Sequence, residues 1–122
     1  MTPPADSANR LELFQGTLDL LILRTLRWGP MHAYAIARYI EQTSGDEFRI
    51  DHGSLYPALQ RLQQEGWTRA YWSTTATKRS AKFYKLTASG RRQLTAQESR
   101  WKRFTSAIAG ILASPRPVGG EE

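Results

Sequence analysis

Planar polar and aromatic side chains line one face of a predicted helix in the middle of the sequence. The segment from Asp51 to Gly66 reads DHGSLYPALQRLQQEG, and its apolar residues recur with the spacing of one buried helix face. These apolar residues are Leu55, Ala58, Leu59 and Leu62. The other face carries Tyr56, Gln60, Arg61 and Gln63, with no carboxylate before Glu65. A face rich in donors and acceptors but free of negative charge favours a polyanion as its partner.

Duplex DNA is one polyanion that such a face could read. In the major groove Gln60 can pair with adenine, and Arg61 or Gln63 can reach guanine or a phosphate. Tyr56 can pack on a thymine methyl group or donate to a phosphate. Base contacts would specify a sequence, whereas phosphate contacts would only position the protein.

The ends of this predicted helix carry residues that favour helix termini. Either Ser54 or Asp51 can cap the first turn. Pro57 is tolerated in a first turn, which needs no intrahelical N–H, and Gly66 suits the position just past the last turn. The segment is therefore predicted to be a helix with defined ends.

Composition limits both the partners and the chemistry. The chain has 122 residues, the size of one domain, and its net charge of +6 favours nucleic acid, an anionic membrane surface or acidic proteins. Cysteine is absent, and His32 and His52 are the only histidines, so we expect no disulfide, no metal site and no cofactor. No stretch reaches the roughly 18 apolar residues of a membrane span, and residues 1–10 lack the apolar region of a signal peptide. We therefore expect a cytoplasmic protein that does not enter the membrane.

Two further helices are predicted before Asp51. From Thr17 to Leu26 the run TLDLLILRTL is apolar almost all round, which predicts a buried helix capped by Thr17. A second helix is predicted from His32 to Thr43, followed by Gly45. Its buried stripe comprises Ala33, Ile36, Ala37 and Ile40. Together with a short extended segment at Phe48–Ile50, the three helices form a helix-turn-helix arrangement.

After Gly66 the hydrophobic period changes from 3.6 to 2. Trp67–Ser73 and Ala81–Thr87 are rich in aromatic residues and Thr, which favours two strands joined by a polar hairpin loop. The loop and the second strand are basic, with no acid anywhere between Gly66 and Gly90. The basic residues are Lys78, Arg79, Lys82 and Lys85. A basic hairpin behind a helix-turn-helix predicts a wing.

The helical pattern returns at Ser89 and continues to about Ala113. Its apolar and aromatic residues repeat in steps of three, four and seven, the seam of a coiled coil. This predicted dimer seam comprises Leu94, Gln97, Trp101, Phe104, Ile108 and Ile111. A domain this small cannot cover such a stripe, so we expect it to pack against a second copy of the chain.

These elements predict a mainly α fold with a small β-hairpin: a winged helix-turn-helix plus a long C-terminal dimerisation helix. The expected divisions are a disordered tail at residues 1–9, the winged domain at 10–87, the dimerisation helix at 88–113 and a second tail at 114–122.

The sequence resembles the PadR family of transcriptional regulators in three motifs. QGTLDLLILRTLRWGPMHAYAIARYI, DHGSLYPALQRLQQEGW and AKFYKLTASGRRQL follow the family pattern in order and spacing, over roughly residues 11–112. The resemblance implies a homodimer that binds double-stranded operator DNA and usually represses. A single C-terminal helix is similar to the short-chain branch of the family. The family's packing of that helix implies that Leu11, Leu13 and Phe14 also lie in the dimer interface.

Carried over by position, the resemblance implies DNA contacts from Tyr34, from the start of the Asp51–Gly66 helix and from the basic wing. Two departures from the family pattern stand out. Ala33 replaces a common glycine without consequence for a helix, and Arg69-Ala70-Tyr71-Trp72 lacks an acid that relatives often carry, so the wing is expected to be unusually basic.

The complete set of expected DNA contacts joins these positions to the cations that can neutralise phosphates. The set comprises Tyr34, Arg38, His52, Ser54, Tyr56, Pro57, Gln60, Arg61, Gln63, Lys78, Arg79 and Lys82. A simpler interpretation of the charges is a solvated face. Ser54 can act as a cap alone, and both histidines precede helices, where they can cap or face a phosphate.

Trp101 has two interpretations. A tryptophan on a helical seam usually belongs to a core or an interface. However, Trp101 with Phe104 and Gln97 could also leave an aromatic slot for a planar hydrophobic effector. Catalysis is not expected, because Asp51, His52 and Ser54 lie within four residues and lack an oxyanion site.

The preferred prediction is a sequence-specific repressor that binds an inverted repeat as a homodimer, with repression resting on the family resemblance. The alternative is a winged-helix interaction module that docks on an acidic partner. The alternative predicts no enriched DNA sequence and no regularly spaced half-sites.

Overall fold

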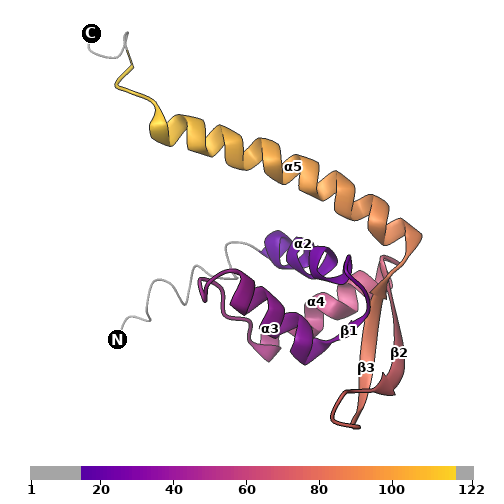
Figure 1. The fold of residues 1–122 in the computed structure, drawn as a ribbon. Coiled ribbons are helices and arrows are strands. Elements are labelled where there is room, and N and C mark those ends of the chain that lie inside the picture. Colours follow the sequence, from indigo (N-terminus) through magenta and orange to yellow (C-terminus); the bar gives the residue numbers. More distant parts are fainter. Residues whose placement is uncertain (1–14, 118–122) are drawn as a thin grey trace.

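The computed structural model describes residues 15–117, in which three helices pack beside a small sheet and a long helix leads away (Figure 1). The elements in chain order are α2 (Gln15–Leu26), β1 (Met31–His32), α3 (Ala33–Thr43), α4 (His52–Gln64), β2 (Thr68–Thr74), β3 (Ser80–Leu86) and α5 (Ala88–Ala113). The predicted fold class, a winged helix-turn-helix with a long C-terminal helix, is confirmed. No helix among the described residues is long and apolar enough to cross a membrane.

One apolar core holds α2, α3 and α4 together. Helices α3 and α4 bury the stripes predicted from their periodicity, and the largest fully buried side chains come from all three helices. They include Ile22, Leu23, Leu26, Ile36, Leu55, Leu59 and Leu62. Burial of aliphatic side chains stabilises a fold by roughly 1.5–3 kcal/mol each, so this contact set positions α4 firmly.

Helix α4 begins at His52, and Asp51 is its cap. The Asp51 carboxylate accepts a hydrogen bond from the Ser54 N–H at 2.8 Å. Of the two predicted caps Asp51 is therefore correct, and Ser54 is the third helical residue. Because the helix starts this early, Pro57 lies in its second turn and not in the first turn as predicted. Pro57 has no N–H, so the Gly53 carbonyl lacks its usual helical donor.

Two other predicted helix starts also change. Helix α2 begins at Gln15, so Thr17 lies inside the helix and is not its cap. Helix α3 begins at Ala33, and His32 caps it by accepting from the Ala35 N–H at 3.3 Å through Nδ1. The capping role considered for His32 is thus confirmed, whereas His52 is the first residue of α4.

The wing is a three-stranded antiparallel sheet with the order β1-β3-β2. The predicted hairpin is present, with Trp72 opposite Lys82 and Tyr71 opposite Phe83. The sequence did not predict β1, whose two residues pair with β3 at Tyr84 and Phe83. A two-residue strand has no periodicity of its own, because pairing with a distant strand alone defines it.

The first turns of α5 are attached to the end of α4. Thr87 caps α5, and its hydroxyl donates to the Gly66 carbonyl at 2.7 Å while its N–H donates to the Trp67 carbonyl at 3.1 Å. An ion pair between Arg24 Nε and Glu98 at 3.1 Å joins α2 to α5. The later turns of α5 extend beyond the domain (Figure 1).

Leu94 is a correction to the predicted dimer seam. Its side chain is 4% exposed and belongs to the chain's own core. It therefore has no surface left for a second copy. The predicted interface residues Leu11, Leu13 and Phe14 lie outside the described residues, as do residues 1–9 and 118–122 of the two predicted tails.

Candidate nucleic-acid interface

The polar face of α4 lies on the surface, where a duplex could reach it. Gly53, Tyr56, Pro57, Gln60, Gln63 and Gln64 are all exposed, while the opposite side of the helix is buried in the core. Tyr56 also packs edge-on against His52, with ring centroids 5.6 Å apart. The face thus presents two rings and three amides without a carboxylate.

A hollow lies between α4 and strand β3. Its volume is about 500 Å³. Its walls are formed by Tyr56, Gln60, Gln63, Gln64, Lys82 and Tyr84. Burial raises the pKa of the Tyr84 phenol, and the neighbouring Tyr56 raises it further, so this hydroxyl stays neutral. The Lys82 ammonium lies 5.9 Å from the centre of the Tyr84 ring. The strand therefore places one cation beside the amides of α4.

A second hollow continues from the first toward the start of α3. It has a volume of about 490 Å³ and shares Tyr56, Lys82 and Tyr84 with the first. Tyr34 and Trp72 form part of its walls, and both are among the exposed large side chains. The Arg38 guanidinium lies 5.9 Å from the centre of the Tyr34 ring. Residues from α3, α4 and the wing are thereby brought onto one concave surface.

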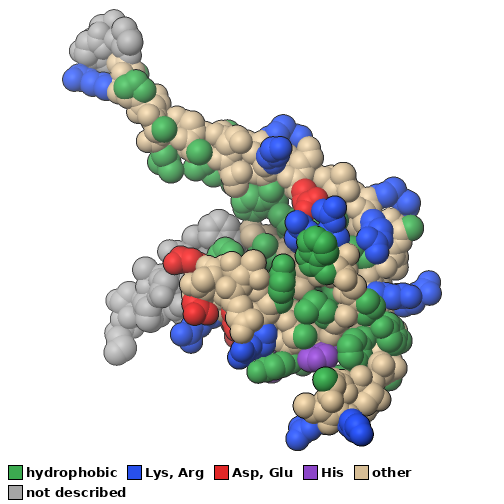
Figure 2. Space-filling model, in the orientation of Figure 1, with side chains coloured by type: hydrophobic (Ala, Val, Ile, Leu, Met, Phe, Trp, Pro, Cys, Tyr) green, Lys and Arg blue, Asp and Glu red, His purple; other side chains and the backbone are tan. Residues whose placement is uncertain are grey.

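The tip of the hairpin is basic, as Figure 2 shows at the end of the wing. Lys78 adopts a positive φ of 64°, and its N–H donates to the Thr75 carbonyl at 2.8 Å. The Thr75 N–H donates to the Arg79 carbonyl at 2.8 Å, which closes the turn. Lys78 and Arg79 are both exposed. A closed turn presents the two cations at a defined place beyond the sheet.

Arg61 does not share the surface of its neighbours on α4. Its guanidinium Nη2 lies 2.8 Å from Asp19 Oδ1 of α2. The side chain therefore runs toward α2 and is only partly exposed. Arg61 was expected to reach guanine or a phosphate, whereas in this structure its guanidinium pairs with Asp19 of α2.

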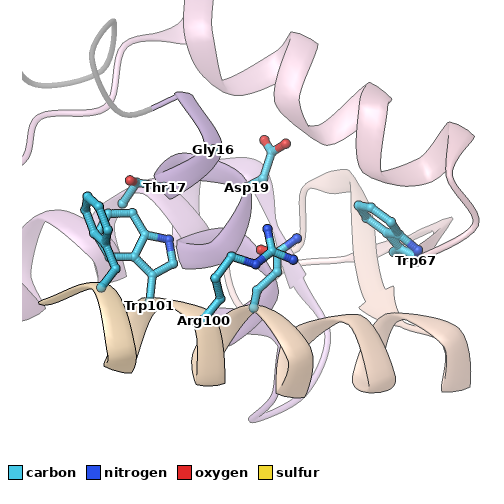
Figure 3. A pocket seen from close by; sticks show the side chains of 8 residues that line it. Gly16, Thr17, Asp19, Trp67, Arg100 and Trp101 are labelled. Carbon is cyan, nitrogen blue, oxygen red and sulfur yellow. The ribbon is translucent and has the colours of Figure 1, made fainter. Parts of the chain in front are cut away.

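A separate hollow of about 400 Å³ lies between α2 and α5 (Figure 3). It is lined by Gly16, Thr17, Asp19, Trp67, Gln97, Arg100, Trp101 and Phe104. Trp101 and Phe104 pack edge to face, with ring centroids 5.3 Å apart. The Thr17 hydroxyl is buried and has no hydrogen-bond partner within the described part of the chain. Aromatic walls with a few polar groups are typical of sites for small molecules.

Comparison with known families identifies the protein's class. Residues 22–96 match the model of the transcriptional regulator PadR-like family. The chain belongs to the PadR-like family. This PadR-like protein is a winged-helix transcriptional regulator and not an enzyme, so the resemblance found in its three sequence motifs is confirmed.

Curated relatives of the PadR-like protein include a negative regulator. The negative transcriptional regulator PadR of Bacillus subtilis is 34% identical over 77 residues, which are 63% of this chain and 42% of that protein. An uncharacterized protein X of Lysinibacillus sphaericus is 27% identical over 99 residues, which are 81% of this chain and 91% of that protein. The chain therefore spans less than half of PadR itself but nearly all of the second relative.

Solved structures agree with this assignment. A PadR family transcriptional regulator from Eggerthella lenta has 29% identity and a TM-score of 0.72, covering 89% of this chain and 93% of that one. A PadR-like transcriptional regulator from Bacillus cereus has 20% identity and a TM-score of 0.75, covering 85% and 99% respectively. The second likeness, at its lower identity, supports the fold alone.

The structure also adds residues that the sequence did not indicate for the PadR-like protein. Gln64 joins the amides of α4, and Trp72 and Tyr84 join the concave surface. Gln64 lies four residues after Gln60 on a helix, so its spacing could have been used. Trp67 lines the hollow beside Trp101 because the turn after α4 folds back against α5. No sequence spacing indicates that contact.

Acidic and histidine side chains do not group into a metal site within residues 15–117. The residue types of a catalytic triad occur at Asp51, His52 and Ser54, but these residues have a structural role. The Asp51 carboxylate accepts from the Ser54 backbone N–H, and His52 contacts Tyr56. These residues therefore start α4 and orient its first turn.

Proposed function

We propose that this PadR-like protein is a homodimeric repressor that recognises an inverted-repeat operator through α4 and the wing. The observation that supports it best is the exposed, acid-free face of α4, continuous with a basic hairpin over one concave surface. In this proposal the amides of α4 read base edges in a major groove. Lys78, Arg79 and Lys82 neutralise neighbouring phosphates. Arg38, Tyr34 and Ser54 contact the DNA backbone near the start of α4. His52 and Pro57 contact the DNA backbone in the same place.

Dimerisation through α5 is supported by the apolar side chains on its outer turns. Phe104 is 53% exposed, Ile108 40%, Ile111 74% and Leu112 81%. A stripe of this kind on an extended helix is typical of an interface between chains. Gln97 and Trp101 continue the stripe toward the domain, and Leu11, Leu13 and Phe14 are proposed to join it. A two-fold dimer then places two recognition helices about 34 Å apart, which requires an inverted repeat.

Repression is supported by the relative from Bacillus subtilis that is named a negative transcriptional regulator. A winged dimer that occupies promoter DNA can block transcription without any further contact. A reporter gene placed behind the selected operator tests the sign. Expression that rises when the protein is produced would contradict repression.

Selection from a random duplex library at near-physiological salt tests the proposal as a whole. We expect an enriched inverted repeat with half-sites one helical turn apart. If no sequence is enriched and binding disappears as salt rises, the surface is merely basic. The interaction module on an acidic partner would then be the better interpretation.

The wing and α4 are expected to respond differently to substitution. The Lys78→Ala/Arg79→Ala variant should weaken binding to all duplexes and flatten the plot of log K against log salt by about two per subunit. An Arg69→Ala/Lys85→Ala variant is the matched control, because it removes the same charge from a cross-strand pair at the base of the same hairpin. Equal loss in both variants would mean that net charge, and not the tip, accounts for the effect.

Gln60→Ala should change the selected base and not only the affinity. Loss of one bidentate amide contact costs about 1–3 kcal/mol at its own position. The measurement is repeated selection with the variant, followed by competition between matched duplexes. A uniform loss across all sequences would remove Gln60 from the base-reading residues.

A planar hydrophobic effector is proposed to bind between α2 and α5 against Trp101, Phe104 and Gln97. The hollow holds all three, and Trp67 faces it as a second indole (Figure 3). In a Trp28→Phe/Trp72→Phe background the two remaining indoles both line the hollow. A stacking compound should quench their fluorescence, and Trp101→Phe should weaken its binding. Unchanged fluorescence across a panel of planar compounds would contradict the effector proposal.

A further inference from the structure

Arg61, the single arginine of α4, turns away from the exposed face of the helix that is proposed to bind DNA. Arg61 Nη2 and Asp19 Oδ1 are 2.8 Å apart, and the two side chains are 37% and 20% exposed respectively. Arg61 follows Gln60 directly, and on a helical projection it lies at the edge of the exposed face, on the same side as Ser54. A long guanidinium side chain at that edge could turn either toward a groove or toward α2. In this structure it turns toward α2.

The consequence is that the exposed face of α4 itself carries no lysine or arginine. The exposed residues of α4 from Gly53 to Gln64 include no lysine, arginine, aspartate or glutamate. Glutamine pairs bidentately with adenine N6 and N7, whereas arginine pairs with guanine O6 and N7. With Arg61 directed away, the groups best placed to read bases are therefore Gln60, Gln63 and Gln64.

We infer that Asp19 determines base specificity by holding Arg61 against α2, so that α4 reads adenine through amides and not guanine through a guanidinium. This inference rests on the proposed function, because it concerns how α4 reads an operator. Asp19 lies on α2, outside the exposed face of α4, and acts only through Arg61. It is thus a positioning residue.

The geometry favours the pair of Arg61 with Asp19 over a contact of Arg61 with DNA. Asp19 is four-fifths buried, so its carboxylate is screened by solvent far less than an exposed group. A charged hydrogen bond at 2.8 Å has favourable length. Neither group has another salt-bridge partner within residues 15–117. Breaking the pair would leave a largely buried carboxylate without its cation, which opposes transfer of Arg61 to a phosphate.

Three variants of the full-length chain test this inference: Arg61→Gln, Asp19→Asn and the double variant. Each is titrated with the operator selected by the wild type, over a range of salt, and each is also put through library selection. Arg61→Gln should bind within about twofold of the wild type with the same salt slope, because Arg61 makes no DNA contact. Asp19→Asn should release Arg61. For this variant the slope of log K against log salt should then steepen by about one per subunit, or guanine should replace adenine at a selected position.

The double variant separates release of Arg61 from damage to α2. If Asp19→Asn acts by freeing Arg61, the added Arg61→Gln change returns the slope and the selected sequence to those of the wild type. A defect that persists in the double variant would show distortion of α2 and overturn the inference. In the double variant the amides at positions 19 and 61 can still hydrogen-bond to each other. Thermal melting of each variant verifies that it is folded.

Two other outcomes would overturn the inference. A tenfold weaker operator complex for folded Arg61→Gln would make Arg61 a direct DNA contact. An unchanged slope and selected sequence for Asp19→Asn would show that Asp19 does not restrain Arg61. Failure of the proposed function looks different, because the wild type itself would then enrich no sequence.

Discussion

The double variant Ile108→Glu/Ile111→Glu is expected to be monomeric and to bind a full operator about a hundredfold more weakly than the wild type. Both side chains lie on the exposed apolar stripe of α5. If a second copy covers this stripe, two glutamates would bring four unpaired charges into one interface, at a cost that dimerisation cannot offset. The affinity falls because one recognition helix loses the effective concentration supplied by its partner, a factor of about 10² to 10⁴.

Sedimentation and anisotropy titration with the selected operator measure the two effects. Ser106→Glu is the control: it places one glutamate on an exposed position of α5, roughly opposite the stripe. The control should remain dimeric and bind normally. If the double variant stays dimeric, α5 is not the dimer interface. If it is monomeric but binds a full operator as tightly as before, the two half-sites are not read by a dimer.

Gly90→Ala is expected to lower the melting temperature by about 10 °C and to loosen the attachment of α5. A Cβ at position 90 would overlap the carbonyl oxygen of Trp67 and lie 2.9 Å from its carbonyl carbon. Backbone cannot yield as a flexible side chain would, so α5 must move away from the turn after α4. Overpacking of this kind costs about 1–3 kcal/mol. A loss of about 2 kcal/mol lowers the melting temperature of a domain of this size by about 10 °C.

Gly110→Ala provides the comparison within the same helix. A Cβ at Gly110 meets nothing within 4 Å, and alanine favours a helix by about 1 kcal/mol over glycine. That variant should therefore melt at the same temperature as the wild type or above it, at equal protein concentration. Similar melting of both variants would mean that α5 is not tightly seated at Gly90. Operator binding by Gly90→Ala then reports whether the position of α5 matters for α4.

Much of the fold could be predicted because its elements have strong local patterns. The period of 3.6 in α3 and α4 predicted their buried stripes, and Gly66, with φ 78°, ends α4 as expected. The change to a period of 2 predicted the hairpin. Three motifs in order then predicted the PadR-like family. Each of these signals depends on residues that are close together in the chain.

Helix starts and the short strand were less well predicted. Thr17 was predicted to be a cap and Pro57 to lie in a first turn, because their residue types are common there, yet the helices begin two and five residues earlier. A residue type favours a cap but does not exclude a nearby competitor such as Asp51. Strand β1 exists only because β3 pairs with it, and that pairing joins residues about fifty positions apart.

The sequence by itself determined the fold class, the family and the exposed polar face of α4. Only the tertiary structure decided which side chains remain available to a partner. Leu94 continues the heptad pattern but is buried in its own domain, while Trp67 reaches the hollow beside Trp101. Arg61 continues the polar face of α4 but pairs with Asp19, 42 residues earlier. Periodicity assigns a residue to a face of its own helix, whereas the partner of a residue at the edge of that face depends on which helix packs beside it.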